Sequence, residues 1–143
     1  MKSIRTCKIV KIHRILNDLS NLIRFSGQCN VSDMEHLEDS CLWATEWDME
    51  LYIPNVLHDV TAIAIPVKAI RSGPGKNGHR CRVEDVVKNR FSYTITLSPL
   101  LSADAAPLKW KLPKKEWRRI CTDTVSIHIP DQEILLLRKK DGP

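Results

Sequence analysis

The chain has 143 residues, close to the size of one ordinary domain, and we interpret residues 1–143 as a single domain. Its 43% hydrophobic and 27% charged residues are near globular averages and exclude general disorder. No apolar run approaches the ~20 residues that a membrane helix needs, and the N-terminus lacks the apolar stretch of a secretory signal. Because the five cysteines are an odd number, which favours reduced thiols, we expect an intracellular protein, cytoplasmic or nuclear and not secreted.

Two amphipathic segments in the N-terminal third predict helices. In residues 8–25, apolar side chains recur at three- and four-residue steps, and polar side chains lie opposite them. Ser32 and Glu35 have the spacing of a capping box, and Met34 and Leu37 follow at helical spacing. We therefore predict a second, short helix over residues 33–43.

The hydrophobic period then changes to two residues, which predicts strands. Apolar residues alternate with acidic or polar ones from Trp47 to Ile53. Residues 60–70 are rich in β-branched side chains and predict a second strand, in which Pro66 indicates an edge position or a bulge. Residues 79–87 and 91–97 predict the clearest hairpin in the chain.

The C-terminal third mixes irregular and regular segments. Residues 98–113 contain three prolines and are interpreted as irregular, and Pro113 can occupy the first turn of a short helix over residues 114–121. Apolar runs at 125–129 and 134–137 predict a terminal hairpin, with a helix starting at Asp131 as the alternative.

The order of these elements predicts the fold class. Helices that precede a run of antiparallel strands are typical of α+β proteins. We therefore expect two N-terminal helices packed on a mainly antiparallel sheet, or on a partly open barrel, of about six strands.

Charge is distributed unevenly along the chain, whose formal net charge is +5. Residues 1–24 carry +5, residues 25–67 carry −8 with no lysine or arginine, and residues 68–143 carry +8. Such asymmetry indicates a charged partner. The acidic segment, residues 33–59, is expected to face away from that partner or to dock another protein, including a second copy of this chain.

A first basic stretch lies in a glycine-containing loop and the strand that follows it. Its cations are Arg71, Lys76, Arg80 and Arg82. Arginine offers paired donors that match a phosphate, and glycine permits close approach of the backbone. We predict that this stretch contacts phosphate; the alternative is a solvated hairpin loop with ordinary surface charge.

A second basic stretch combines six cations with two tryptophans. Lysine and arginine can pair with phosphates while indole rings stack on bases, although the same composition suits an anionic membrane surface. Core positions are the alternative for both indoles, and Trp117 fits that alternative better than Trp110. The residues predicted to contact nucleic acid here are Lys109, Trp110, Lys111, Lys114, Lys115, Arg118 and Arg119.

Two further groups of residues have types suited to metal ions. Alternating carboxylates on one strand can hold Mg²⁺ for phosphodiester cleavage, but they need partners from other strands; these are Glu46, Asp48 and Glu50. A zinc shell would draw on Cys29, His36 and Cys41, with His79 and Cys81 to complete it. The spacing matches no standard zinc motif, and we assign no metal site, cofactor or catalytic residue.

These observations predict a non-enzymatic nucleic-acid-binding module, for RNA more than for DNA. One alternative is a self-assembling structural protein, such as a viral matrix or capsid subunit, that binds anionic lipid or genome. The other alternative is a metal-dependent nuclease that uses the three carboxylates. The main prediction requires that folding brings the two basic stretches onto one surface.

Overall fold

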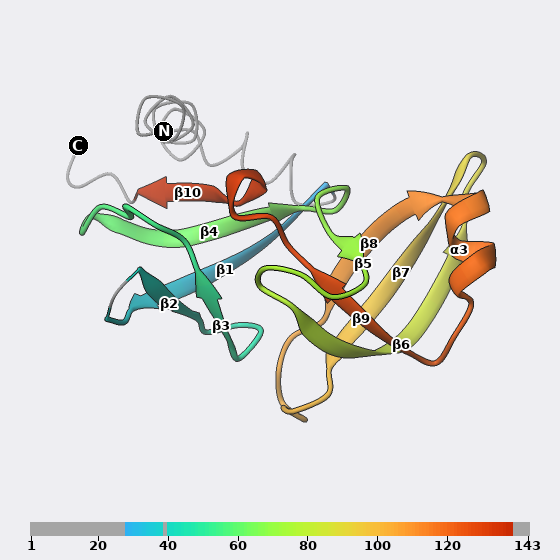
Figure 1. The fold of residues 1–143 in the computed structure, drawn as a ribbon, viewed down its shortest axis with the longest axis horizontal. Coiled ribbons are helices and arrows are strands. Elements are labelled where there is room, and N and C mark those ends of the chain that lie inside the picture. The colour runs from blue at the N-terminus through green and yellow to red at the C-terminus, as the bar shows by residue number, and fades with distance from the viewer. Residues whose placement is uncertain (1–27, 39, 139–143) are drawn as a thin grey trace.

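The computed structural model describes residues 28–38 and 40–138, and this part of the chain is mostly β, 52% strand and 9% helical. Figure 1 shows two groups of strands side by side, with helix α3 at the far end of the second group. The elements in chain order are β1 (Cys29–His36), β2 (Cys41–Ala44), β3 (Met49–Tyr52), β4 (Val60–Pro66), β5 (Arg71–Ser72), β6 (His79–Lys88), β7 (Ser92–Pro99), β8 (Leu108–Pro113), α3 (Lys114–Ile120), β9 (Thr124–His128), η1 (Asp131–Glu133) and β10 (Leu135–Arg138).

The strands form two five-stranded sheets, and every pairing is antiparallel. The first sheet has the order β10-β4-β1-β2-β3, and the second has the order β5-β9-β6-β7-β8. Within the described residues, no helix is long and apolar enough to cross a membrane.

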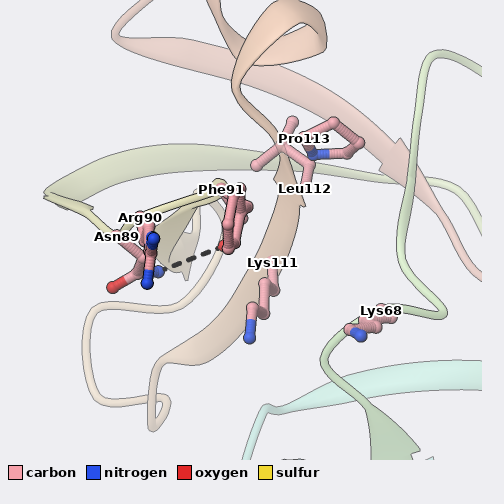
Figure 2. A pocket seen from close by; sticks show the side chains of 8 residues that line it. Lys68, Asn89, Arg90, Phe91, Lys111, Leu112 and Pro113 are labelled. Atoms are coloured by element: carbon pink, nitrogen blue, oxygen red, sulfur yellow. Dashed lines mark hydrogen bonds between the residues drawn. The ribbon is translucent and has the colours of Figure 1, made fainter.

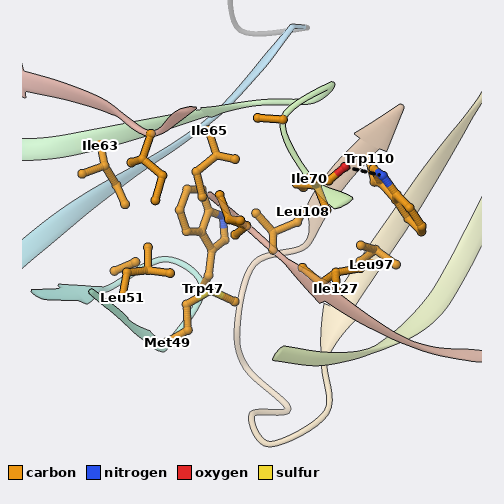
Figure 3. Close-up of a cluster of buried hydrophobic side chains, with 14 of the residues drawn as sticks. Trp47, Met49, Leu51, Ile63, Ile65, Ile70, Leu97, Leu108, Trp110 and Ile127 are labelled. Carbon is orange, nitrogen blue, oxygen red and sulfur yellow. Dashed lines mark hydrogen bonds between the residues drawn. The ribbon is translucent and has the colours of Figure 1, made fainter. Parts of the chain in front are cut away.

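One hydrophobic core joins the two sheets. Alternate side chains of the strands of both sheets point into it, as the two-residue period of a strand requires. Figure 3 shows Trp47 among side chains of the first sheet and Trp110 among those of the second. Residues at most 2% exposed include Trp47, Leu51, Ile63, Ile65, Leu97, Leu108, Trp110 and Ile127.

The amide of Asn30 links the two sheets at the first seam. Its Nδ2 donates to the carbonyl oxygens of Ile65 (3.1 Å) and Lys109 (2.9 Å), and its Oδ1 accepts from the Lys109 backbone N (2.7 Å). A backbone bond from Lys111 N to Val67 O (2.9 Å) follows along the same seam. A side-chain amide thus continues the hydrogen-bond ladder between β1 and β8.

Asn77 makes the equivalent link at the second seam. Its Oδ1 accepts from Tyr52 N (2.6 Å), and its Nδ2 donates to the carbonyl oxygens of Tyr52 and Ile129 (both 3.1 Å). Beside it, His79 Nε2 lies 3.2 Å from the Glu50 carbonyl oxygen. Burial lowers the pKa of His79, although this hydrogen bond opposes the shift, so the imidazole at the seam favours its neutral form.

The predicted α+β fold is wrong for the described residues. The segment predicted as a helix over residues 33–43 forms β1, a turn and β2. Ser32 caps no helix: its Oγ donates to Asp33 O (2.7 Å) and accepts from Glu46 N (3.0 Å). The predicted helix over residues 8–25 lies outside the described residues.

Other elements differ from their prediction in extent or in pairing. The 79–87 and 91–97 hairpin is confirmed as β6 and β7, and the helix after Pro113 as α3. The segment predicted as irregular, 98–113, contains strand β8, and Asp131 begins only a short 3₁₀ turn. The prediction of a terminal hairpin is wrong, because β9 pairs with β5 and β6 while β10 pairs with β4 in the other sheet.

We expect Asn30→Ala to lower the free energy of unfolding by about 3 kcal/mol, because three hydrogen bonds at the seam lose their partner. Urea denaturation measures this change. The control is Gln132→Ala, which removes an exposed amide and is expected to change the free energy by less than about 0.5 kcal/mol. Equal stabilities of the two variants would show that Asn30 does not hold the sheets together.

Candidate nucleic-acid interface

The outer side of the second sheet gathers cations from both basic stretches. On β6, the exposed Arg80 and Arg82 flank Cys81, which is fully buried. On β8, Lys109 and Lys111 alternate with buried apolar residues. We call this surface the basic face, and its cations are Arg71, Arg80, Arg82, Lys109 and Lys111.

The strand register places these cations across one continuous surface. On β7, which lies between β6 and β8, Ser98 is opposite Arg82, and Thr96 is opposite Lys109. Since neighbouring strands are about 4.8 Å apart, β6 and β8 are about 10 Å apart, and Arg82 is displaced from Lys109 by two further positions along β7. On the far side of β6, Ser126 of β9 lies opposite Arg80.

Small hydroxyl side chains fill the space between the cations. Lys109 Nζ donates to Thr96 Oγ1 (2.8 Å), and Arg80 Nη1 lies 3.5 Å from Ser126 Oγ. Hydroxyl groups can donate and accept hydrogen bonds, and short side chains let a polymer backbone approach the sheet. The other hydroxyl residues of this face are Thr94, Ser98 and Thr124.

Part of the positive charge on the basic face is neutralised. Arg82 Nε lies 3.2 Å from Glu84 Oε2, and both side chains are largely exposed. Such a surface pair is weak, so it can exchange for a phosphate contact. Asp85 lies opposite Thr96 after a bulge in β6, which brings a second carboxylate onto the face.

Lys76 and Gly75 of the first basic stretch contact other parts of the protein. Lys76 Nζ lies 3.7 Å from Asp131 Oδ1 and 5.4 Å from the centre of the Tyr52 ring, at the seam between the sheets. A Cβ on Gly75 would lie 2.6 Å from the ring of His128. The missing side chain at Gly75 thus lets the loop pack on β9.

The indoles of the second basic stretch belong to the core. Trp110 is 1% exposed and donates from Nε1 to the Ile70 carbonyl oxygen (2.9 Å), as Figure 3 shows. Trp117 of α3 packs edge-on against Trp110, with ring centres 6.3 Å apart, and contacts Tyr93. Neither indole presents a face to solvent on which a base could stack.

The packing of Trp117 also shows that the cations of the second stretch belong to two different sides of the second sheet. Trp110 points to the inner side of the second sheet, so α3 lies on that side, whereas Lys109 and Lys111 point outward. The helix that carries the remaining cations therefore lies on the side of the sheet opposite the basic face. These cations are Lys114, Lys115, Arg118 and Arg119.

The structure has a pocket at the edge of the basic face that the sequence did not predict. It has a volume of about 570 Å³ and is lined by Lys68, Asn89, Arg90, Phe91, Ser92, Lys111, Leu112 and Pro113 (Figure 2). The sequence pattern placed Phe91 among the apolar positions of a strand, but the ring is 78% exposed. The sequence does contain one sign of this exposure, because Phe91 follows Arg90 directly at the turn between the two predicted strands.

The candidate metal ligands do not form a site. Among residues 28–38 and 40–138, no group of three or more histidine, cysteine or acidic side chains is placed to hold a metal ion. Glu46 and Asp48 lie in the turn between β2 and β3, and Glu50 lies on β3. Cys29 and His36 lie at opposite ends of β1, which separates two members of the suggested zinc shell.

Comparison of the chain with protein-family models and with curated proteins gives no match. The basic face and its pocket are therefore interpreted from their own geometry.

We expect Cys81 to resist alkylation in the folded protein, because it points away from the basic face. Burial raises the pKa of its thiol from 9.0 to about 11, which lowers the reactive thiolate fraction about 100-fold. Peptide mapping after iodoacetamide treatment at pH 8 measures the rates, with the exposed Cys121 as the internal reference.

The variant Arg80→Cys provides the matched test of strand register. A cysteine at this neighbouring position points outward and is expected to react at about the rate of Cys121. Reaction of Cys81 at that same rate in the native protein would contradict the alternation that defines the basic face.

Proposed function

We propose that the protein binds nucleic acid through the basic face and acts as a binding module, not as an enzyme. The observation that supports this proposal is the meeting of the two basic stretches: Arg80 and Arg82 share one surface with Lys109 and Lys111, across β7. Cations at this spacing suit the repeated charges of a phosphate backbone. An intracellular setting belongs to the same proposal.

The shape of the basic face favours RNA over duplex DNA. A recognition element for B-DNA is narrow enough to enter the major groove, typically a helix or a two-stranded ribbon. Here the cations lie on β5, β6 and β8, with β9 and β7 between these strands, and form a broad surface on which a strand can lie. Hydroxyl groups such as Thr96 and Ser126 between the cations can hydrogen-bond a ribose 2′-hydroxyl.

The carboxylates of the acidic segment that lie on strands belong to the first sheet, whereas the carboxylates that reach the basic face are Glu84 and Asp85 of β6. Asp33 and Glu35 are on the exposed side of β1, and Glu50 is on β3. This separation keeps the carboxylates of Asp33, Glu35 and Glu50 away from the cations of the second sheet. It also supports the expectation that segment 33–59 faces away from the bound nucleic acid.

We expect the double variant Arg80→Ala/Lys109→Ala to weaken binding of single-stranded RNA by about tenfold or more at low salt, since two phosphate contacts are removed. The slope of log affinity against log salt concentration should fall by about 1.4, at about 0.7 per contact with a single strand. Fluorescence anisotropy with a labelled oligoribonucleotide measures both quantities.

The matched control is Lys114→Ala/Arg118→Ala, which removes the same net charge from α3. It is expected to bind RNA nearly as the unmodified protein does, because α3 lies on the other side of the sheet. Equal losses in the two double variants would show that net charge, and not the basic face, drives binding. Uptake onto phosphatidylserine vesicles without RNA binding would identify a lipid surface as the partner and overturn the proposal.

A further inference from the structure

The pocket beside the basic face lies where the two sheets meet. Lys68 comes from the turn after β4 in the first sheet, while Lys111 comes from β8 in the second. The bond from Lys111 N to Val67 O (2.9 Å) holds these two segments together. The remaining wall comes from the β6–β7 turn, residues 89–91. Figure 2 shows Phe91 and Lys111 close to each other, with Lys68 across from them.

Phe91 is an aromatic ring held in solvent. Its 78% exposure is the largest among the exposed aromatic side chains in the described part of the chain; the next, Tyr52, is 41% exposed. A phenylalanine left in water forgoes about 1.5–3 kcal/mol of burial free energy. Because the ring also lines a pocket, it is a candidate for contact with a ligand.

Hydrogen bonds fix the turn that carries Phe91. Asn89 N donates to Ser92 O (2.8 Å), and Asn89 Nδ2 donates to Thr94 Oγ1 (2.8 Å) and lies 3.4 Å from Ser92 Oγ. A ring on an ordered turn is positioned before a ligand arrives, which reduces the entropic cost of binding.

The charged groups around the ring are basic. The Arg90 guanidinium carbon lies 5.2 Å from the centre of the Phe91 ring, a cation–π distance, yet the ring keeps its high exposure. Lys68 and Lys111 supply two more positive charges, and none of the eight lining residues is acidic. The pocket therefore combines a flat apolar surface with three cations.

We propose that this pocket binds one unstacked nucleotide of a single-stranded nucleic acid, with the base on Phe91 and the flanking phosphates at Lys68, Arg90 and Lys111. This inference rests on the proposed function and names the form of nucleic acid that the site prefers. Bases in a duplex are paired and stacked, so they offer no free face to Phe91. The volume, about 570 Å³, is within the usual range of small-ligand sites.

Lys111 connects the pocket with the basic face. Its side chain belongs to both, opposite Thr94 on β7 and in the wall of the pocket. A nucleic-acid strand whose phosphates lie along the basic face can therefore enter the pocket while its phosphates stay close to cations. The face supplies charge that is independent of base stacking, and the pocket supplies the stacking contact.

The test uses the full chain with three probes: a single-stranded oligoribonucleotide of about ten nucleotides, a duplex of the same length, and inorganic polyphosphate. Phe91→Ala is expected to weaken single-strand binding by about tenfold, the usual effect of removing one base–aromatic stack. Binding of polyphosphate, which has no bases, should change less than about twofold. Phe91→Tyr keeps an aromatic ring and should retain single-strand binding.

Leu101→Ala is the matched control, because Leu101 is fully exposed and lies outside the pocket. It is expected to leave all three affinities unchanged. A 2-aminopurine base in the oligonucleotide gives a direct readout: its fluorescence should fall on binding to the unmodified protein and to Phe91→Tyr, but not to Phe91→Ala at saturation. Circular dichroism confirms that each variant is folded.

The outcomes separate this inference from the proposed function. If the unmodified protein binds none of the three probes, the basic face itself is not a nucleic-acid site. If it binds RNA, but Phe91→Ala binds the single strand and changes 2-aminopurine fluorescence as the unmodified protein does, only the nucleotide pocket is refuted. Equal affinity for single strand and duplex would likewise refute the pocket and leave the basic face.

Discussion

Two asparagine amides, Asn30 and Asn77, constrain how the sheets of this protein meet. Each presents a carbonyl and an N–H group to a backbone segment of the other sheet, as a peptide group in a neighbouring strand would. They satisfy backbone groups at seams where the strands themselves do not pair. The basic face depends on this arrangement, because Asn30 binds both backbone polar groups of Lys109 and so fixes the position of β8.

The local pattern of the sequence was sufficient for β6 and β7 but not for β1. In β7 the buried Ile95 and Leu97 alternate with polar residues, so the two-residue period is visible, whereas β6 buries only Cys81 and is delimited by the turn residues on either side of it. In β1 the inward positions include Asn30 and Ser32, which are buried because they are hydrogen-bonded. Once polar residues occupy the core side of a strand, the remaining apolar residues can match a helical spacing by coincidence, as Met34 and Leu37 did.

Pairing between distant strands and the environment of single aromatic residues depend on tertiary structure. β9 and β10 are adjacent in sequence, yet the 3₁₀ turn at Asp131–Glu133 leads the chain from one sheet to the other. Trp110 lies between two lysines because a strand alternates its faces, and its Nε1 is satisfied by a carbonyl 40 residues away. Phe91 continues the apolar pattern of β7 by one step beyond the core, so the pattern alone assigned it to the wrong environment.

The two-sheet architecture determines where the acidic and basic segments of the sequence lie relative to each other. A chain with separated acidic and basic segments can neutralise itself on folding, or it can keep the charges apart. Here Asp33 and Glu35 lie on the first sheet, and the cations of the basic face lie on the second. The free energy of separating them is modest at a solvated surface, where the screening length is about 8 Å at physiological salt. The separation leaves a cation-rich surface on the second sheet, next to the exposed aromatic ring of Phe91. In the function that we propose, charge sets the strength of binding and its salt dependence, while Phe91 sets the preference for a single strand.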